Sequence, residues 1–406
     1  MHSRASLKNA FYIGLVCSII YLSVYIARNV LSAVSPQIEE NTVFGDNSIA
    51  VIGTLSSVFF FTYAIGQLIN GLIGDIVKSK YMIVFGLLLA GLASIVIPIF
   101  YSKTIITYFI YGVMGFTLSM IYGPMTKAIA ENTKESHAVK CNLALNFAAY
   151  FGTPLAGVFA LVFTWNNSFK ASGYLLIFIS VLSFIFFTYL ERKKIIVYNN
   201  YNNNNSHKEN SLVSSVRVLV GKDIIKFTIV SVLTGVIRTS VLFWLPMYLK
   251  QYLMFSEKKS ASIFTATSLI ISVGSFAAVY IYKLLKHSID KTLLFSFVIS
   301  AVLFLFTFLI KIPIANICLL LLAIMASNCA ATMMWSFYCP SLAETGLVSS
   351  ATGYLDFISY MSASIATKLF ANAATSIGWG GLILVWMGLM MLGVIISLPY
   401  KKRCEG

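Results

Sequence analysis

Residues 11–34 read FYIGLVCSIIYLSVYIARNVLSAV, an apolar run with one charged side chain, Arg28. A helix that crosses the hydrocarbon core of a bilayer needs about 20 mostly apolar residues, and this run is long enough. It is too long for the apolar part of a signal peptide and lacks a small-residue cleavage site. We therefore expect a retained membrane-spanning helix.

Runs of the same kind recur along the whole chain. The predicted spans are 11–34, 49–73, 81–101, 104–127, 138–163, 171–190, 224–249, 260–284, 292–311, 313–340, 347–374 and 379–399. Lys311 and Pro313 mark a very short turn between the ninth and tenth spans. The sequence therefore predicts an all-α membrane protein with twelve transmembrane helices.

Composition supports the membrane prediction independently of any motif. Hydrophobic residues make up 58% of the 406 residues and charged residues 11%, whereas a soluble protein carries about 25% charged residues. So few charges cannot cover a water-exposed surface. An ordinary cytosolic enzyme, a disordered chain and a disulfide-stapled secreted domain are excluded.

One long polar segment, 191–223, divides the predicted spans into six and six. It contains the low-complexity stretch YNNYNNNNSHKEN, and asparagine and lysine cannot build a core. We predict an N-terminal six-helix bundle at 1–190, a cytoplasmic linker at 191–223 and a C-terminal six-helix bundle at 224–406.

The lysines and arginines are distributed unevenly between the two ends of the spans. If the N-terminus is cytoplasmic, 20 of the 29 lie on the cytoplasmic side and six on the other. The remaining three, Arg28, Arg238 and Lys368, fall inside spans. Cytoplasmic loops of membrane proteins carry such an excess. The bias predicts cytoplasmic termini, and the Asn-, Lys- and Ile-rich usage favours a bacterial inner membrane.

The sequence shows no constellation typical of catalysis, metal binding or nucleic-acid binding. The six cysteines are scattered without a CxxC pair, and the four histidines fall near span ends or in loops. The net charge of +15 is explained by loops that flank the membrane. We expect neither an enzyme nor a nucleic-acid-binding protein, with no cofactor and no metal, and we expect a monomer in the lipid bilayer.

Two arginines lie well inside predicted spans. Arg28 is in the first span and Arg238 in the seventh, each without an acidic residue within a turn or two along its own helix. An arginine near mid-span costs roughly 2.5–3.5 kcal/mol on insertion scales. One interpretation is a buried arginine that pairs with an acid on another helix or with carbonyl groups. The other is a cationic site for an anionic substrate near the bilayer midplane.

Two patterns favour the substrate site. Tyr21, Tyr25, Arg28 and Ser32 recur at helical spacing and share one face, which suits an aqueous cavity better than lipid. In addition, a proline follows each arginine by eight residues, Pro36 after Arg28 and Pro246 after Arg238. Paired halves with binding residues at matching places are common in transporters.

The eleventh span carries two further charged residues, Asp356 and Lys368, with Tyr360 between them. Their spacing keeps them broadly on one side of a helix. Lys368 either belongs to the site or extends its amine to the outer surface, and Asp356 either faces the cavity or lies near its cytoplasmic mouth. The interior is net positive in either case, which fits an anionic substrate.

Several motifs resemble the organophosphate:phosphate antiporters of the major facilitator superfamily, whose best-known members carry glycerol-3-phosphate and hexose phosphates. The first span resembles that family from Tyr21 through Tyr25 and Arg28 to Pro36. The seventh resembles it in Arg238, Trp244 and Pro246. The stretch from Gly66 to Asp75 resembles the superfamily's signature between helices 2 and 3. Asn142-Leu-Ala-Leu-Asn146 is similar to the family's Asn-x-Ala-His-Asn.

The resemblance implies roles for particular residues. Arg28 and Arg238 would jointly hold a phosphoryl group, with Tyr25, Tyr63 and Tyr360 lining the site. Further implied or candidate positions are Tyr21, Gln67, Asn142, Asn146, Trp244, Asp356 and Lys368, with Gly71 and Asp75 in the conformational loop motif. The chain departs from the family at four positions. Leu145 stands where the family has histidine, and Phe243 stands where it has an acidic residue. Gln67 stands where glycerol-phosphate carriers have lysine, and Ile76 stands where the superfamily usually has arginine.

These observations predict a secondary transporter that works by alternating access. We expect a small organic anion, in the first place a phosphate ester such as glycerol phosphate or a sugar phosphate, exchanged for inorganic phosphate. Two alternatives stay open. One is a proton-coupled carrier of carboxylates or other organic anions, and the other is a transporter-like membrane sensor of sugar phosphate.

Overall fold

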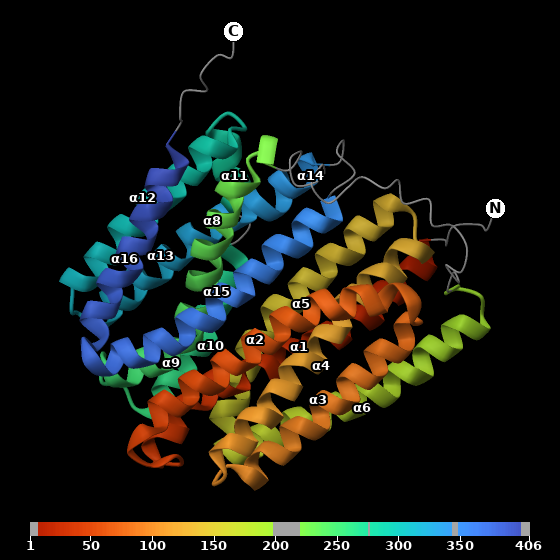
Figure 1. Cartoon of the computed structure of the whole chain (residues 1–406), viewed down its shortest axis with the longest axis horizontal. Helices are drawn as coiled ribbons and strands as arrows, with labels where there is room; N and C mark the ends of the chain where they lie inside the picture. The colour runs from red at the N-terminus through yellow and green to blue at the C-terminus, as the bar shows by residue number, and fades with distance from the viewer. Residues whose placement is uncertain (1–6, 198–219, 275–276, 343–347, 399–406) are drawn as a thin grey trace. The chain divides into compact units, whose positions relative to one another are not determined.

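The computed structural model describes residues 7–197, 220–274, 277–342 and 348–398, and the secondary structure in these ranges is helical throughout (Figure 1). The helices before the linker are α1 (Leu7–Glu40), η1 (Gly45–Asn47), α2 (Ser48–Ile76), α3 (Ser79–Phe100), α4 (Thr104–Asn132), α5 (Glu135–Val162) and α6 (Trp165–Arg192). Those after it are α8 (Ile224–Gly235), η2 (Val236–Val241), α9 (Leu242–Gln251), α10 (Glu257–Gly274), α11 (Ala277–Leu284), α12 (Ile289–Leu309), α13 (Pro313–Met333), η3 (Met334–Tyr338), α14 (Cys339–Ser341), α15 (Val348–Ser376) and α16 (Gly378–Ser397).

The helices end where the sequence stops being apolar or where proline begins a new turn. The short turn predicted at Lys311 and Pro313 is confirmed, because α12 ends at Leu309 and Pro313 occupies the first turn of α13. Proline suits that position because its missing N–H has no partner in a first turn anyway. At the start of α12, the Ser288 hydroxyl accepts a hydrogen bond from the Lys291 N–H.

Ten helical stretches within the described residues are long and apolar enough to cross a membrane. They match ten of the twelve predicted spans. The other two predicted spans are helical as well: 260–284 falls on α10 and α11, and 347–374 falls on α15 from residue 348 onward. Asp356, Lys368 and several hydroxyl side chains make α15 less apolar than its neighbours.

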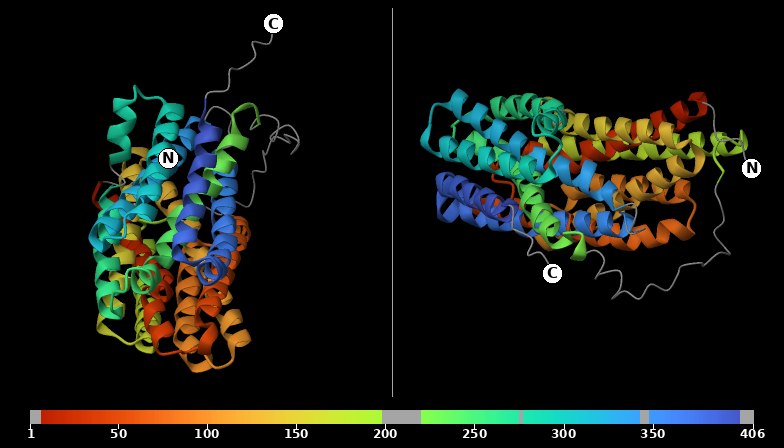
Figure 2. Two further views of the ribbon diagram at one scale, coloured as in Figure 1. Left: turned by 90° about the vertical axis from the view of Figure 1, so that its left-hand side faces the viewer. Right: turned by 90° about the horizontal axis from the view of Figure 1, so that it is seen from above.

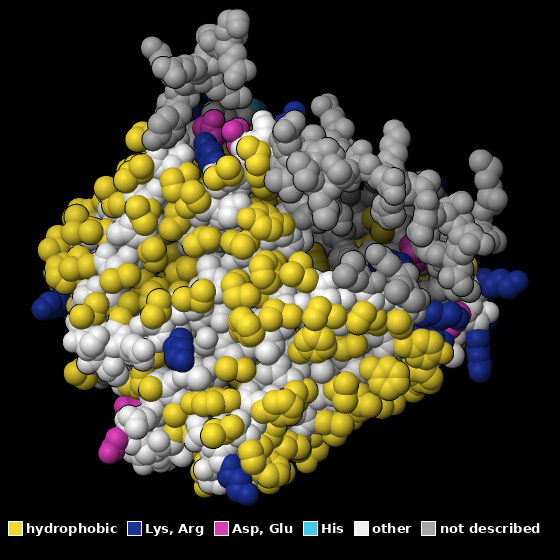
Figure 3. All heavy atoms as spheres, viewed as in Figure 1, with side chains coloured by type: hydrophobic (Ala, Val, Ile, Leu, Met, Phe, Trp, Pro, Cys, Tyr) yellow, Lys and Arg dark blue, Asp and Glu magenta, His cyan; other side chains and the backbone are white. Residues whose placement is uncertain are grey.

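The outer faces of the helices are apolar. On α6, Tyr174, Phe178, Val181 and Ile185 are 61%, 59%, 54% and 56% exposed, and their spacing of four, three and four residues places them on one helix face. Hydrophobic side chains likewise dominate the face seen in Figure 3. Such a surface is unfavourable in water and suits hydrocarbon. The chain is thus an all-α integral membrane protein.

The chain divides into two compact units, Met1–Ser206 with Phe243–Ser272, and His207–Leu242 with Val273–Gly406. The segment 243–272 groups with the first unit. Hydrogen bonds explain this grouping. Ser32 Oγ donates to the carbonyl of Phe243 over 2.6 Å, and Lys250 Nζ donates to the carbonyl of Pro36 over 2.9 Å.

Within the first unit, α1 packs mainly on α5, α2 on α4, and α3 on both α4 and α6, and these helices run alongside one another in Figure 2. Polar side chains join the pairs at buried points. Asn70 Nδ2 donates to Ser119 Oγ over 2.8 Å between α2 and α4, and Ser94 Oγ donates to the Phe169 carbonyl over 2.8 Å between α3 and α6.

Within the second unit, α12 packs on α13 and α16, and α15 packs on α8 and η2. Ser231 Oγ donates to the Leu355 carbonyl over 2.6 Å, and Ser240 Oγ donates to the Ala363 carbonyl over 3.0 Å. Buried hydroxyls that reach backbone carbonyls of a neighbouring helix are suited to a bilayer, where polar groups need protein partners. They fix α15 against the segment that carries Arg238.

Candidate functional site

Arg28 lies near the middle of α1, and its side chain is only 8% exposed. Burial of an ionised group away from water is costly unless the protein replaces the lost hydration. A guanidinium at this depth is therefore retained for a reason other than the stability of the helix. Its surroundings indicate what that reason is.

Three aromatic rings surround the Arg28 guanidinium. Its central carbon lies 5.2 Å from the ring centre of Tyr25 on α1, 5.3 Å from Phe60 and 5.1 Å from Tyr63, both on α2. The negative face of an aromatic ring attracts a cation, by about 2 kcal/mol or more when the pair is desolvated. We call Tyr25, Phe60 and Tyr63 the aromatic cage. The cage stabilises the guanidinium through the faces of the rings and carries no formal negative charge of its own.

Further aromatic contacts fix the positions of the cage residues. Tyr21 contacts Tyr25 edge-on at 5.0 Å between ring centres and stacks on Tyr122 of α4 at 5.3 Å. Phe59 contacts Tyr63 at 6.1 Å on the other side. Offset and edge-on pairs of this kind are each worth about 0.5–1.5 kcal/mol beyond area burial. The cage is therefore held rigidly between α1, α2 and α4.

The backbone of α1 is also fixed around Arg28. Asn29 Nδ2 donates to Thr153 Oγ1 of α5 over 3.2 Å and to the carbonyl of Tyr25 over 2.7 Å. Beside them, α5 places Gly152 so close to α1 that a Cβ there would lie 2.4 Å from the Cβ of Tyr25. Glycine is thus required at this helix contact. Thr153 and Gly152 together set the depth and rotation of α1.

Arg238 belongs to the second unit and lies on η2, a π-helical turn inserted into the apolar segment 224–251. Single π-helical turns are rare and occur frequently at functional sites. The side chain of Arg238 is half-buried. The neighbouring α15 contacts η2 through Ser240, whose hydroxyl also accepts a hydrogen bond from Thr367 over 2.9 Å.

The predicted site residues fall into two sets, one in each unit. Tyr21, Tyr25, Arg28 and Tyr63 form one cluster in the first unit. Gln67 lies one turn beyond Tyr63 on α2 and is half-buried, and Trp244 on α9 is fully buried. Asn142 on α5 is exposed; Asn146 lies on the same helix, and its side chain is outside the described residues.

The second set lies on α15 together with Arg238 on η2. Tyr360 is buried and Asp356 is half-buried, whereas Lys368 is exposed. The exposure of Lys368 agrees better with an amine that reaches the surface than with one in a binding cavity. For the conformational loop motif, Gly71 is exposed near the end of α2, and the side chain of Asp75 is outside the described residues.

Sequence reasoning missed Phe60 and Tyr122, which contact Arg28 and Tyr21. Both read as ordinary apolar or aromatic residues of a span, and no local pattern separates them from core residues. Phe60 was detectable only by its position three residues before Tyr63, on the same face of α2.

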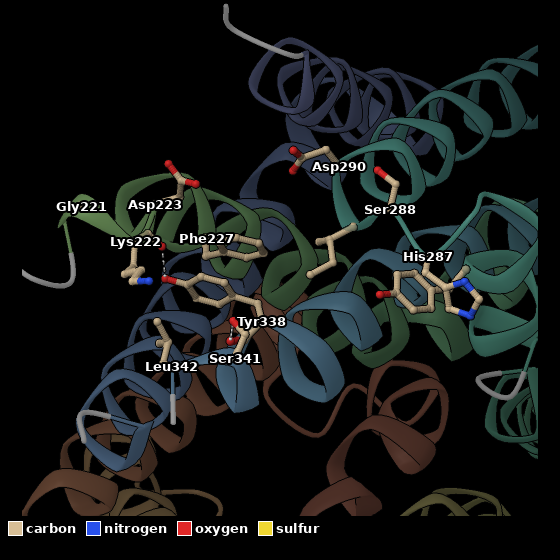
Figure 4. Close-up of a pocket in the computed structure, with 12 residues that line it drawn as sticks. Gly221, Lys222, Asp223, Phe227, His287, Ser288, Asp290, Tyr338, Ser341 and Leu342 are labelled. Carbon is tan, nitrogen blue, oxygen red and sulfur yellow. Dashed lines mark hydrogen bonds between the residues drawn. The ribbon is translucent and has the colours of Figure 1, made fainter. Parts of the chain in front are cut away.

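The second unit contains a cavity of about 550 Å³ at the ends of α8, α11 and η3 (Figure 4). Its lining includes four ionisable side chains, Lys222, Asp223, His287 and Asp290. The Tyr338 hydroxyl donates to the carbonyl of Lys222 over 2.9 Å, and Lys226 pairs with Asp290 at 2.7 Å. Two stacked rings, Phe227 and Tyr338, form one wall. No group of three His, Cys, Asp or Glu side chains suited to a metal occurs within the described ranges.

The family model described as Major Facilitator Superfamily matches residues 17–367. The chain belongs to the Major Facilitator Superfamily. The match includes Arg28, Arg238 and both halves of the chain, and it agrees with the helical architecture. No curated protein shows significant sequence similarity to this superfamily member.

Solved structures of other transporters share its fold. A D-xylose-proton symporter aligns with a TM-score of 0.74 at 11% identity, covering 96% of this chain and 97% of that chain. The xylose transporter XylE from E. coli, in a partially occluded inward-open conformation, aligns at 0.75 and 12% identity, covering 98% and 99%. A bacterial homolog of the human lysosomal transporter Spinster aligns at 0.73 and 11% identity, covering 97% of each chain. At such low identity these likenesses establish the fold of a secondary transporter, and they leave the substrate open.

Proposed function

We propose that this member of the superfamily carries a small organic anion, in the first place a phosphate ester such as glycerol phosphate or a sugar phosphate, in exchange for inorganic phosphate. The observation that carries the proposal is the Arg28 guanidinium, 8% exposed in the middle of α1 and surrounded by three rings at 5.1–5.3 Å. A guanidinium offers two parallel N–H donors that match phosphate or carboxylate oxygens.

Arg238 supports the same proposal from the second unit. It sits on a π-helical turn, and its place in the seventh span matches that of Arg28 in the first. Two guanidinium groups suit a phosphate ester because its two negative charges lie on the oxygens of one phosphoryl group, whereas a dicarboxylate such as succinate separates its two charges. The resemblance to organophosphate:phosphate antiporters at both arginine motifs points in the same direction.

The test is direct binding to purified full-length protein in detergent. Glycerol phosphate, glucose 6-phosphate, inorganic phosphate and a carboxylate such as succinate are titrated calorimetrically, and counterflow is then measured in liposomes loaded with phosphate. Phosphate esters are expected to bind and to exchange with phosphate. Succinate binding without phosphate ester binding overturns the proposal and favours the proton-coupled carboxylate carrier. Phosphate ester binding without any exchange favours the sensor.

A double-mutant cycle tests whether both arginines act on the same ligand. Arg28→Lys and Arg238→Lys keep the charge and lose the planar fork. If both contact one phosphoryl group, the effects of the two changes on glycerol phosphate affinity are non-additive. Additive effects, or an unchanged affinity in either single variant, remove one arginine from the site.

A further inference from the structure

A second cavity lies in the first unit, away from Arg28, where the end of α1, the end of α3 and the start of α6 meet. Its volume is about 460 Å³, and it is lined by Asn41, Thr42, Val43, Tyr101, Thr164, Trp165 and Asn166. The lysine and arginine distribution assigns these helix ends to the side opposite the cytoplasm. Nothing in the transport proposal uses this cavity.

The lining has many hydrogen-bonding groups and no ionisable acid or base other than the weakly acidic tyrosine. Asparagine, threonine and tyrosine side chains supply both donors and acceptors. A charged ligand that enters such a cavity loses hydration and gains no opposite charge. The lining therefore favours a ligand that is polar, uncharged and able to form several hydrogen bonds.

One acceptor in this lining is buried without a protein partner. Within the described part of the chain, the Asn166 Oδ1 atom is enclosed and receives no hydrogen bond. A buried acceptor left unsatisfied costs roughly 1–3 kcal/mol. In addition, no side chain caps the start of α6 at Thr164, so first-turn N–H groups there lack a side-chain acceptor. Rotation of the Asn166 carboxamide about its terminal torsion would turn Oδ1 toward the cavity, where a ligand hydroxyl can donate to it and accept from such an N–H group.

Two aromatic rings give the cavity an apolar wall. Tyr101 and Trp165 meet edge-on at 5.5 Å between ring centres, with an angle of 74° between their planes. Trp165 is buried, whereas Tyr101 is 38% exposed. A partly exposed ring held by a buried one offers a fixed apolar surface, of the kind that receives the C–H face of a sugar or polyol.

The walls are held in place by hydrogen bonds between helices. Gln37 Nε2, on α1, donates to the Ala160 carbonyl over 2.6 Å and to the Phe163 carbonyl over 3.2 Å, which fixes α1 to the corner between α5 and α6. The carboxamide of Asn41 is oriented by its donation to the Gln37 carbonyl over 2.8 Å. A cavity with such fixed walls loses little conformational entropy when a ligand binds.

We propose that this cavity binds a neutral polyhydroxylated molecule, a sugar or a polyol, at a site separate from the arginine site. The ligand stacks its C–H face on Tyr101 and donates a hydroxyl to Asn166. The competing explanation is that Tyr101 and Trp165 are interfacial anchors, as tyrosine and tryptophan often are in membrane proteins. Anchors need no ligand, so binding measurements separate the two explanations.

The experiment uses purified full-length protein in detergent with D-glucose, myo-inositol and glycerol as neutral probes and inorganic phosphate as the charged probe. Asn166→Leu keeps the size of the side chain and removes the acceptor. Asn167→Leu is the matched control, because its neighbour Asn167 is exposed and does not line the cavity. Binding is measured by calorimetry, and folding by circular dichroism and size-exclusion chromatography.

At least one neutral probe is expected to bind, with its affinity about tenfold lower in Asn166→Leu and within about twofold of wild type in Asn167→Leu. Thr164→Val and Tyr101→Leu repeat the test if Asn166→Leu does not fold. Arg28→Lys is expected to weaken anion binding and leave the neutral probe unaffected, so the two proposals fail separately. The inference is overturned if folded wild-type protein binds no neutral probe, if Asn166→Leu binds like wild type, or if Arg28→Lys abolishes sugar binding.

Discussion

The guanidinium carbon of Arg28 lies 5.1 Å from the ring centre of Tyr63, so that α1 and α2 meet through a cation and a π-face. This contact joins the charged residue of one helix to the hydroxyl-bearing ring of another. It contributes to the stabilisation of a guanidinium that is buried between the two helices. It also predicts that the ring of Tyr63 is needed more than its hydroxyl.

The first prediction concerns the aromatic cage. Tyr63→Phe keeps the ring face, and we expect the affinity for glycerol phosphate to stay within about threefold of wild type. Tyr63→Leu removes the ring, and Arg28→Lys removes the fork. We expect Arg28→Lys to lower affinity by about 30-fold or more, the equivalent of about 2 kcal/mol.

Calorimetry on folded variants checks these values. Tyr63→Leu should fall between the other two variants, because the guanidinium remains but loses one of its three rings. An affinity for Tyr63→Phe as low as that for Arg28→Lys would show that the hydroxyl, and not the ring, matters.

The second prediction concerns the contact between α1 and α5. A Cβ at Gly152 would lie 2.4 Å from the Cβ of Tyr25 and 3.0 Å from the carbonyl oxygen of Leu22, so Gly152→Ala must push the helices apart. We expect a lower melting temperature and weaker anion binding, because Tyr25 belongs to the aromatic cage. Gly123→Ala on α4 is the control, since a Cβ there meets nothing within 4 Å. Equal melting temperatures in the two variants would contradict the close packing.

The sequence predicted much of the fold because apolar length and charge asymmetry are local signals. The structure matches ten of the twelve predicted spans, the short turn before Pro313 and the contacts of Tyr25 with both Tyr21 and Arg28. Only part of the aromatic cage around Arg28 could be predicted from the sequence. Tyr25 stands on the same helix as Arg28, but Phe60 approaches from α2, and that contact depends on how the helices pack.

Other features have no signal in a single sequence. The π-helical turn at Val236–Val241 depends on how the backbone accommodates one extra residue, and the polar residues in it, Arg238, Thr239 and Ser240, do not by themselves specify a π-helical turn. The sequence predicted that the face of the first span carrying Tyr21, Tyr25, Arg28 and Ser32 lines an aqueous cavity. Ser32 is instead buried, with its hydroxyl donating to the Phe243 carbonyl. A hydroxyl is equally compatible with water and with a buried carbonyl, so spacing alone could not distinguish them.

The third prediction uses a carboxyl at the start of α10. Burial, with a smaller contribution from Glu40, raises the pKa of Glu257 above its ordinary value of 4.5, while Lys250 and Lys258 act in the opposite direction. Because the folded-state pKa is the higher one, the protonated form is favoured by folding. The resulting stabilisation is present below pH 4.5 and is lost as the pH rises through the folded-state pKa.

We therefore expect Glu257→Gln to melt at a higher temperature than wild type at pH 7–8, and the difference to shrink as the pH falls toward about 4.5. Thermal melts of purified protein across this range measure it. Asp46→Asn, at an exposed acid on the same side of the first unit, serves as the control and should show no such pH-dependent gain. A constant difference at all pH values would mean that Glu257 acts through packing instead of charge.

The fourth prediction concerns membrane orientation. The bias of 20 lysines and arginines against six predicts that residue 46 lies outside and that residue 286, in the turn after α11, lies in the cytoplasm. Single cysteines at these positions, in a background lacking the six native cysteines, should react differently with an impermeant thiol reagent. In intact cells the cysteine at 46 should be labelled and the one at 286 should not. The reverse pattern would invert the topology.

The last prediction is that anion binding follows the ionisation of the ligand and not that of a histidine. In the described part of the chain, His137 lies in the first turn of α5 and His287 in the turn before α12, and neither belongs to the aromatic cage. Between about pH 5 and 8, histidine is the side chain that ordinarily changes charge. The second pKa of a phosphate monoester is about 6, so the dianion dominates at pH 7.

If the arginines prefer the dianion, affinity for glycerol phosphate should rise as the pH increases through about 6 and then level off. Succinate serves as a partial control, because it is mostly ionised above about pH 6 and should show a flatter profile there. His137→Gln should leave the profile for glycerol phosphate unchanged, which separates ligand titration from protein titration. Calorimetric titrations from pH 5 to 8 give the answer. A profile that is flat for the phosphate ester would mean that the site does not discriminate between the two ionisation states of the phosphoryl group. A profile that shifts in His137→Gln would mean that the protein, and not the ligand alone, sets the pH dependence.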